Sequence, residues 1–450
     1  MTLPPKPESR PAKVSLWRYA RLFRQDILSA QPARLYRAWM AEFKTPFFRS
    51  YLINQPDLIQ TVLKTRPDEY PKSDRIGEGL RPLLGNSVFL TNGAIWKRQR
   101  RIIDPAFEGG RLRETFPAIW DAAEAAAARL APHDGAPLEV EAQTSHAAAD
   151  VIFRTLFSIP IEHHMAREVF DEFKTYQRSQ PILNIAAFVP LPRWLPRLFR
   201  RDTKRSAAKI RRLITALTAE RMEAIKAGTA PDDLATKIMT TPDPEDGSTF
   251  TTEEMVDQVA IFFLAGHETS ASALAWAMYL VATHPDWQDR LAEEAQAIDQ
   301  CDFAVMGKLK QSRDVFREAL RLYPPVPMMV REASCPATFR DRTVARGAQV
   351  VISPWHLHRH ERLWDNPDGF DPARWHSENG KKCQREAYLP FSAGARVCPG
   401  AGFAMVEGPL ILSRILRDYR IEVVGEKPPV PVAHLTVRSK DGILLRFVRR

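Results

Sequence analysis

One cysteine near the end of the chain lies in a loop whose residue types could present its sulfur to a metal. The stretch Phe391–Gly400 holds Cys398 between Gly394 and Gly400, with Arg396 two residues before the cysteine. Glycine lets the backbone approach a flat partner and take conformations that a side chain forbids. Backbone N–H groups of the loop and the start of a following helix would favour a thiolate. A lone thiolate without zinc-type neighbours suits the axial position of a haem iron, and the alternative is a buried structural cysteine.

A long helix is predicted in the middle of the chain. Thr251 and Glu254 have the spacing of a capping box, which predicts where the helix begins. We expect the helix to run to Thr283, because His284-Pro285 stops it.

Polar residues interrupt the apolar part of this helix. The apolar run 259–264 is followed by the polar cluster 265–270, which excludes a membrane span. Gly266 removes side-chain bulk, and Thr269 can bond to a carbonyl one turn earlier, so we expect a loosened turn with room for dioxygen and water. His267 is given no ligand role. The alternative is a buried cluster of polar caps.

Two further pairs have helical spacing. Trp96 and Arg100 lie one turn apart in a basic stretch, which alone indicates a solvated helix. Beside a cofactor with carboxylates, Arg100 would become part of an anion clamp. Glu318 and Arg321 stand three residues apart, a spacing that carries little weight alone.

These four motifs, in this order, resemble the cytochrome P-450 family of haem-thiolate monooxygenases, of the soluble bacterial type. The cysteine loop carries the resemblance most fully, because it matches Phe-x-x-Gly-x-Arg-x-Cys-x-Gly throughout, and the likeness extends from about Leu52 to Arg446. The resemblance implies a mainly α fold with a small β region. It places haem b between the long central helix and the Cys398 loop. We expect a single domain over residues 1–450.

The resemblance also implies roles for individual residues. Cys398 is the expected iron ligand, and Glu268 and Thr269 are the expected catalytic pair that manages protons and water. Arg374 should join Glu318 and Arg321 in a structural network. The residues expected to bind the haem besides the cysteine are Trp96, Arg100, Arg331 and Arg396.

The implied reaction inserts one atom of O2 into a lipophilic substrate by hydroxylation or epoxidation and reduces the other atom to water. No flavin or iron–sulfur motif occurs in the sequence, so we expect a ferredoxin or flavodoxin, with its reductase, to supply electrons. Other haem-thiolate enzymes, such as a peroxygenase or an isomerase, and a haem sensor are the alternatives. The residues expected to face the substrate are apolar: Phe262, Phe263, Ala265, Val326, Met328 and Met329.

Composition agrees with a large globular enzyme. The 450 residues are 44% hydrophobic, and the 36 prolines are spread along the chain. The 4 cysteines have neither disulfide-framework nor zinc spacing, which favours a reducing compartment, and we expect a cytoplasmic protein without a transmembrane segment. The net charge of +10 favours acidic proteins or anionic membranes as partners. We expect no nucleic-acid partner, because no binding motif accompanies the charge.

Three further segments are predicted outside these motifs. Residues 1–45 form an extension whose amphipathic helix, from Leu16 to about Glu42, packs on the domain, with peripheral membrane contact as the alternative. The apolar, proline-rich segment Pro181–Arg205 is predicted to form a mobile lid over the substrate channel. Final strands are expected near Val430–Val448.

Overall fold

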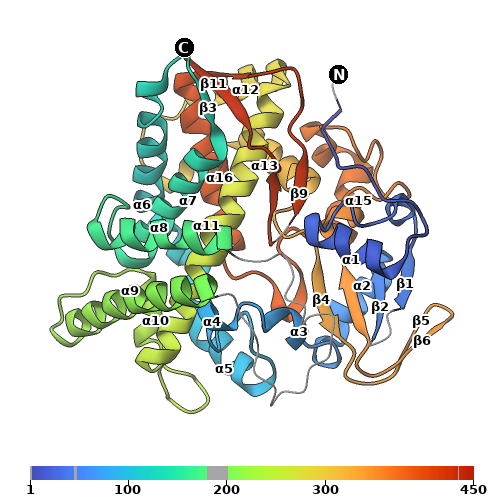
Figure 1. Ribbon diagram of the computed structural model, residues 1–450. Coiled ribbons are helices and arrows are strands. Elements are labelled where there is room, and N and C mark those ends of the chain that lie inside the picture. Colours follow the sequence, from blue (N-terminus) through green and yellow to red (C-terminus); the bar gives the residue numbers. More distant parts are fainter. Residues whose placement is uncertain (1–2, 45–47, 180–200, 434) are drawn as a thin grey trace. The chain divides into compact units, whose positions relative to one another are not determined.

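The computed structural model describes residues 3–44, 48–179, 201–433 and 435–450, and helices dominate it (Figure 1). The chain forms two compact units. Unit 1 comprises Met1–Pro71, Ala123–Ala147 and Glu268–Arg450, and unit 2 comprises Lys72–Ala122 and Ala148–His267. The mainly α fold with a small β region is therefore confirmed, and the single domain over residues 1–450 stays a prediction.

Unit 2 is helical within its described residues, and the helices α6, α7 and α11 also contribute residues to unit 1. Its helix α9 packs against α8 and α4. Its helices are α3 (Asp74–Gly77), α4 (Arg81–Leu84), α5 (Gly93–Ile103), η4 (Asp104–Phe107), α6 (Gly109–Ala128), α7 (Val140–Phe157), α8 (His164–Ser179), α9 (Arg201–Lys226), α10 (Leu234–Thr240) and the first half of α11 (Thr252–Ala282).

Unit 1 combines a second group of helices with short strands. Helices α12, α13 and α16 pack against one another (Figure 1). Its helices are α1 (Leu16–Gln25), η1 (Ala33–Tyr36), α2 (Pro56–Gln60), η2 (Thr61–Thr65), η3 (Pro67–Glu69), η5 (Ala131–His133), α12 (Pro285–Gln296), η7 (Phe303–Gly307), α13 (Lys310–Leu322), α14 (Pro354–Leu357), η8 (Pro372–His376), α15 (Glu378–Glu386), η9 (Gly394–Arg396) and α16 (Ala401–Asp418). Its strands are β1 (Met40–Lys44), β2 (Arg49–Ile53), β3 (Pro137–Glu139), β4 (Met329–Glu332), β5 (Ala337–Phe339), β6 (Arg342–Val344), β7 (Gln349–Ile352), β8 (Tyr419–Val423), β9 (Pro431–Ala433), β10 (Val437–Ser439) and β11 (Leu444–Arg449).

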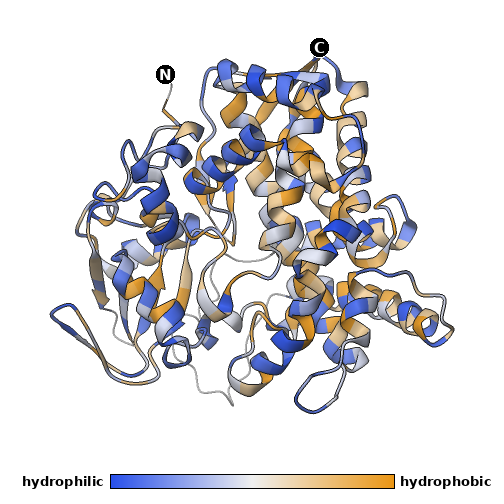
Figure 2. Ribbon diagram, turned by 180° about the vertical axis from the view of Figure 1, so that it is seen from behind, coloured by the Kyte–Doolittle hydropathy of each residue, from blue (hydrophilic) through white to orange (hydrophobic). Residues whose placement is uncertain are grey.

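The largest sheet of unit 1 has the strand order β1-β2-β7-β4. Strand β2 runs parallel to β7, with Leu52 opposite Val351, and the other two pairs are antiparallel. Val350 and Ile352 are fully buried in the main hydrophobic core of this region, and Figure 2 shows hydrophobic residues along the sheet. The smaller sheets are β3-β11-β8, β10-β9 and β5-β6. The predicted C-terminal strands are therefore present.

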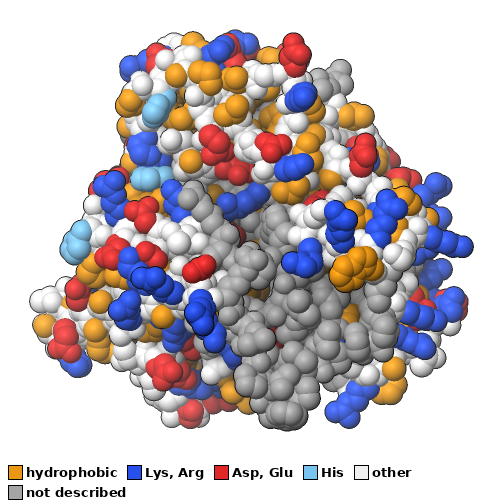
Figure 3. Space-filling view, viewed as in Figure 1, with side chains coloured by type: hydrophobic (Ala, Val, Ile, Leu, Met, Phe, Trp, Pro, Cys, Tyr) orange, Lys and Arg blue, Asp and Glu red, His pale blue; other side chains and the backbone are white. Residues whose placement is uncertain are grey.

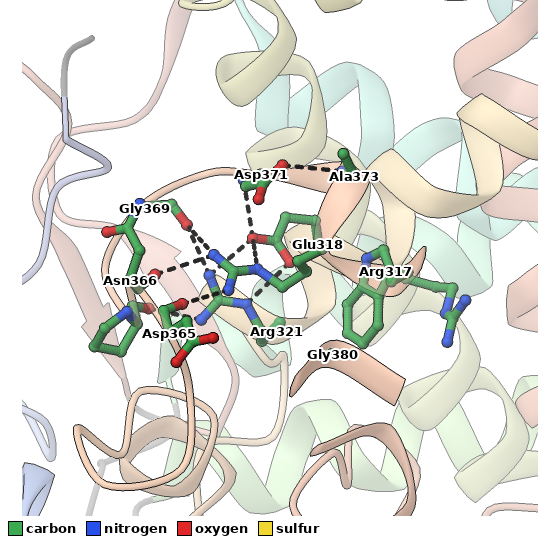
Figure 4. Close-up of polar contacts among 12 residues, drawn as sticks. Arg317, Glu318, Arg321, Asp365, Asn366, Gly369, Asp371, Ala373 and Gly380 are labelled. Carbon is green, nitrogen blue, oxygen red and sulfur yellow. Dashed lines mark hydrogen bonds and ion pairs between the residues drawn. The ribbon is translucent and has the colours of Figure 1, made fainter. Parts of the chain in front are cut away.

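Glu318 in α13 is the centre of a buried ion network (Figure 4). Its Oε1 accepts from Arg321 Nη2 at 2.8 Å and from Arg374 Nε at 2.9 Å. Both arginines also donate to the carbonyl oxygen of Gly369, which ties them to the loop before η8. Burial acts to raise the pKa of Glu318, but the two guanidinium groups outweigh it and hold the pKa below its usual value. The predicted structural role of these three residues is confirmed.

The N-terminal helix is shorter than predicted. α1 ends at Gln25, and the chain reaches Glu42 through η1 and strand β1. The Asp26 carboxylate accepts from the backbone N–H groups of Leu28 and Ser29. These bonds build a turn directly after the helix, and this local competition is why the amphipathic pattern alone placed the end wrongly.

α11 begins as predicted. Thr251 N–H donates to Glu254 Oε2 at 2.9 Å and Glu254 N–H donates to Thr251 Oγ1 at 3.2 Å, which is a complete capping box. α11 is assigned as helical throughout, including residues 265–270, so the polar cluster does not end the helix. The mobile-lid prediction for Pro181–Arg205 lies outside the described residues up to 200, and α9 begins at Arg201.

Candidate functional site

The loop around Cys398 is held by close backbone packing. Gly394 has a φ of +68°, and a Cβ there would lie 2.0 Å from the carbonyl oxygen of Leu63, so only glycine fits. The N–H of Cys398 donates to Phe391 O at 2.9 Å, and α16 begins three residues later at Ala401. Cys398 itself is exposed in this structure. A rigid loop therefore presents an accessible sulfur just before a helix N-terminus, where negative charge is favoured.

Two arginines from different elements of unit 1, Arg331 and Arg396, lie close enough for the charge of one to affect the pKa of the other. Arg331 in β4 is buried, and burial together with the charge of Arg396 lowers its pKa to about 10. Arg396 directly precedes the cysteine turn, and its Nη1 donates to Pro67 O at 2.7 Å. Arg331 has no carboxylate partner among the described residues, and its Nε has no hydrogen-bond partner. A buried guanidinium without an acid is costly, so this charge pattern fits a bound group that carries carboxylates.

The central helix has one accessible face. From Met255 to Val281, every residue of α11 is buried except four, which are partly or fully exposed. Those four, at spacing i, i+3, i+4 and i+7, are Phe262, Ala265, Gly266 and Thr269. This spacing places them on one side of the helix. The face is mostly apolar and ends at one hydroxyl group. Gly266 also packs closely, because a Cβ there would lie 2.4 Å from Ile152 Cδ1.

Glu268 and Thr269 differ in their surroundings. Glu268 is buried and its Oε1 lies 3.1 Å from Arg438 Nη2, while Oε2 accepts from Thr436 Oγ1 at 3.3 Å. Burial raises the pKa of Glu268, and Arg438 and then Thr436 partly offset that rise. Thr269 instead belongs to the accessible face of α11. The pair therefore offers a buried acid next to an accessible hydroxyl.

Sequence reasoning missed one contact that relates the central helix to the cysteine loop. The Ser270 hydroxyl donates a hydrogen bond to Glu407 Oε1, so α11 contacts α16 one residue beyond Thr269. Glu407 lies six residues into α16 from Ala401, or about 9 Å along the helix axis. The turn of α11 that contains Ser270 is thus joined, within unit 1, to the helix that follows the cysteine loop. A single glutamate in the otherwise apolar stretch 401–412 was the available sequence signal.

Comparison with known proteins identifies the family. The cytochrome P450 family model matches residues 36–446. The chain belongs to the cytochrome P450 family. It is 32% identical over 387 residues to cyclooctat-9-en-7-ol 5-monooxygenase of Streptomyces melanosporofaciens, covering 84% of this chain and 81% of the relative. It is 31% identical to cyclooctatin synthase of the same organism (87% and 84% covered) and 30% identical to cytochrome P450 4A14 of Rattus norvegicus (91% and 82% covered).

As a P450, the protein is a haem-dependent monooxygenase with dioxygen as co-substrate, and it requires electrons from a redox partner. Haem b supplies the iron at which dioxygen is activated. The residues present fit this cofactor, because unit 1 contains an accessible cysteine in a glycine-shaped loop and a buried arginine that has no carboxylate partner in the described part of the chain. Among the described residues, no helix is both long and apolar enough to cross a bilayer.

The structure places Trp96 and Arg100 in unit 2, on α5. Trp96 is buried, with Lys72 Nζ 5.7 Å from its ring centre. Arg100 Nε lies 2.8 Å from Asp104 Oδ1, so this guanidinium already has an acidic neighbour on its own helix turn. The next residue, Arg101, donates two hydrogen bonds to the Asp243 carboxylate, at 2.6 and 2.7 Å. These contacts neither remove nor establish the predicted haem-binding roles of Trp96 and Arg100.

Three histidines that alternate along the chain, His356, His358 and His360, have structural roles. Burial, followed by the charge of nearby arginines, lowers the pKa of His356 and of His358 to about 3. His358 Nε2 accepts from Leu389 N–H at 2.8 Å, and the ring of His360 stacks on Trp39 at 4.5 Å. Neutral, buried rings with such partners belong to the core. Within the described ranges, no group of three or more potential metal ligands was found.

Proposed function

We propose that this P450 holds its haem iron through Cys398 and oxidises a compact, hydrocarbon-rich substrate placed against the exposed face of α11. The supporting observation is the stripe of four accessible residues on an otherwise buried helix. Three of them, Phe262, Ala265 and Gly266, offer no charge and no side-chain hydrogen bond. An apolar face with one hydroxyl favours burial of apolar surface over polar recognition.

The proposal also assigns haem-binding and catalytic roles to individual residues. We infer that Arg331 and Arg396 bind a haem propionate, because both are cations in one buried region and an Arg–carboxylate pair is strong there. Trp96 and Arg100 are proposed for the other propionate. Thr269 holds the water that passes protons to the oxygen atom released as water, and Glu268 supplies them.

The names of two relatives support a proposal for the substrate class. One relative is named for oxidising cyclooctat-9-en-7-ol at position 5 and another is named cyclooctatin synthase. We propose a cyclic, largely hydrocarbon alcohol or alkene as the substrate class. The test is a spectral titration of the purified protein with cyclic terpenoid alcohols and, as the matched comparison, straight-chain fatty acids. Displacement of haem-bound water by the cyclic set supports the proposal, and a response to fatty acids alone contradicts it.

The electron donor and the cellular compartment of the enzyme are the next parts of the proposal. A ferredoxin or flavodoxin with its reductase serves as electron donor, in a cytoplasmic setting that suits four free cysteines. Reconstitution with each donor, comparing product formed per reductant consumed, tests the first point. Cell fractionation tests the second.

Helix α1 is the proposed surface for peripheral contact with an anionic membrane. Trp17 is 83% exposed, and three basic residues of the same helix are also exposed, namely Arg18, Arg21 and Arg24. Figure 3 shows Lys and Arg side chains gathered around the place of this helix. Binding to vesicles with anionic lipid, lost in Trp17→Ala and absent with neutral vesicles, is the expected result. Equal binding of the variant contradicts the assignment.

A further inference from the structure

Helix α5, which carries Trp96 and Arg100, has two further arginines that contact the segment leading into α11. Arg98 and Arg101 are three positions apart and therefore share one face of α5, whereas Trp96 and Arg100, four positions apart, share the opposite face. Helix α5 and residues 243–257 belong to unit 2. The contacts of Arg98 and Arg101 therefore hold α5 from the side that faces away from Trp96 and Arg100.

Arg101 binds a closed turn that precedes α11. Its Nε donates to Asp243 Oδ1 at 2.6 Å and its Nη2 donates to Asp243 Oδ2 at 2.7 Å, and the Asp243 side chain is 1% exposed. The backbone N–H of Asp243 donates to Ser248 O, and that of Gly247 donates to Asp243 O, both at 2.8 Å. The Arg101 guanidinium holds the pKa of Asp243 below its usual value, which keeps the carboxylate charged. A bidentate pair of this kind fixes direction as well as distance.

Arg98 connects the same turn to the first residues of α11. Its Nε donates to Ser248 Oγ at 3.0 Å, and its Nη2 donates to Thr249 O at 2.9 Å. Its Nη1 donates to Glu254 Oε1 at 2.8 Å, and Glu254 is also the partner of Thr251 in the capping box. One guanidinium group thus ties α5 both to the turn and to the start of the central helix.

Gln99, the residue directly before Arg100, makes a third connection to α11. The Gln99 side chain is buried, and its Nε2 donates to Asn86 O at 2.7 Å. The backbone N–H of Asn86 in turn donates to Oδ2 of buried Asp257 in α11, also at 2.7 Å. Arg100 is therefore bracketed in the sequence by three residues whose side chains are held from the segment 243–257.

We propose that the segment 243–257 is a clamp that fixes α5, so that Trp96 and Arg100 meet a haem propionate in one fixed position. This inference rests on the proposed haem-binding role of Trp96 and Arg100. A group that touches a ligand binds well only when its neighbours lock its position, and a loosened α5 would let the propionate contact break more often. The residues that act on haem binding through Arg100 are thus positioning residues, namely Arg98, Gln99 and Arg101.

Release of haem from the holoenzyme to an excess of apomyoglobin, followed by absorption, tests the clamp without turnover. Arg98→Gln and Arg101→Gln should each release haem several-fold faster than the wild type, with shifted propionate bands in resonance Raman spectra. Arg101→Lys keeps the charge but not the bidentate pairing, so its rate should lie between the two. Arg111→Gln is the matched control, because it breaks a bidentate pair with Asp232 elsewhere in unit 2 and should release haem at the wild-type rate. Equal acceleration in Arg111→Gln and Arg101→Gln overturns the proposal.

A double variant distinguishes positioning from general loosening of the fold. If Arg101 acts through Arg100, the Arg100→Gln/Arg101→Gln protein should release haem no faster than Arg100→Gln alone. The same fold-increase from Arg101→Gln with and without Arg100 contradicts the positioning role. If Arg100→Gln itself releases haem as slowly as the wild type, the proposed role of Arg100 fails, and the clamp fails with it. If Arg100→Gln releases haem faster while Arg98→Gln and Arg101→Gln match the wild type, the clamp alone is contradicted.

Discussion

Nη2 of Arg438 in β10 lies 3.1 Å from Oε1 of Glu268 in α11, so a C-terminal strand holds the buried acid of the central helix. The Arg438 side chain is 36% exposed and that of Glu268 is 6% exposed. The guanidinium therefore touches solvent while the carboxyl group does not. A cation in that position lowers the free energy of the carboxylate form and controls when Glu268 releases its proton.

Replacing Arg438 should change the acidity of Glu268. In Arg438→Gln the attractive charge is lost, so the pKa of Glu268, already raised by burial, should rise further. Proton release then requires a higher pH, and the pH profile of coupling should shift upward. The measurement is product per reductant consumed between pH 6 and pH 9. Arg446→Gln, which disturbs an exposed arginine–glutamate pair with Glu422, is the control, and equal profiles for both variants contradict the account.

Thr269 is expected to matter for coupling more than for substrate binding. Thr269→Ala removes the one hydroxyl on the accessible face of α11, so substrate should still bind and reductant should still be consumed. Product per reductant should fall, with more hydrogen peroxide released, because general acid–base contributions are roughly 10²–10⁴-fold. Thr269→Ser, which restores the hydroxyl, should recover most of the loss. Unchanged coupling in Thr269→Ala shows that the hydroxyl serves packing only.

The buried Glu407 should make the protein less stable as the pH rises. The folded-state pKa of about 7 lies above the ordinary value of 4.5, so between these values the folded protein holds a proton that the unfolded chain has lost. Stability therefore decreases from about pH 4.5 to about pH 7 by up to ~3 kcal/mol. Glu407→Gln should remove this slope. The difference between the unfolding temperatures of the variant and the wild type should therefore change in favour of the variant as the pH rises toward 7. Parallel stability curves contradict the raised pKa.

The sequence predicted local residue pairs well and long-range partners poorly. The Thr251–Glu254 capping box and the Glu318–Arg321 pair are local, at fixed helical spacing, and both are confirmed. Arg438 lies 170 residues from Glu268, and no periodicity connects the two. Such long-range pairs depend on how elements pack, which one sequence does not encode in its spacing.

The limits at α1 and α11 have different origins, one local and one long-range. The amphipathic pattern continued past Gln25, but the Asp26 turn ended the helix. The polar cluster at 265–270 predicted a loosened turn, which stays a prediction, but it gave no sign of partners on other elements, such as Arg438 and Glu407.

The ion network at Glu318 predicts a large loss of stability. Glu318→Gln leaves two buried guanidinium groups without their acid, and breaking a buried pair of this kind costs roughly 3–5 kcal/mol. Denaturant unfolding of the holoenzyme is the measurement. Glu378→Gln is the matched control, because that glutamate is 92% exposed in its pair with Lys381 and should change stability little. Similar losses in the two variants contradict the structural role of the network.

The assignment of Cys398 as the iron ligand is the central claim, and the spectrum of the reduced, carbon-monoxide-bound protein tests it most directly. The wild type should show the thiolate-ligated absorption band, Cys398→Ser should lose that band and monooxygenase activity, and Cys301→Ser, at another exposed cysteine, should keep both. A Cys398→Ser protein that retains the thiolate band would contradict the account.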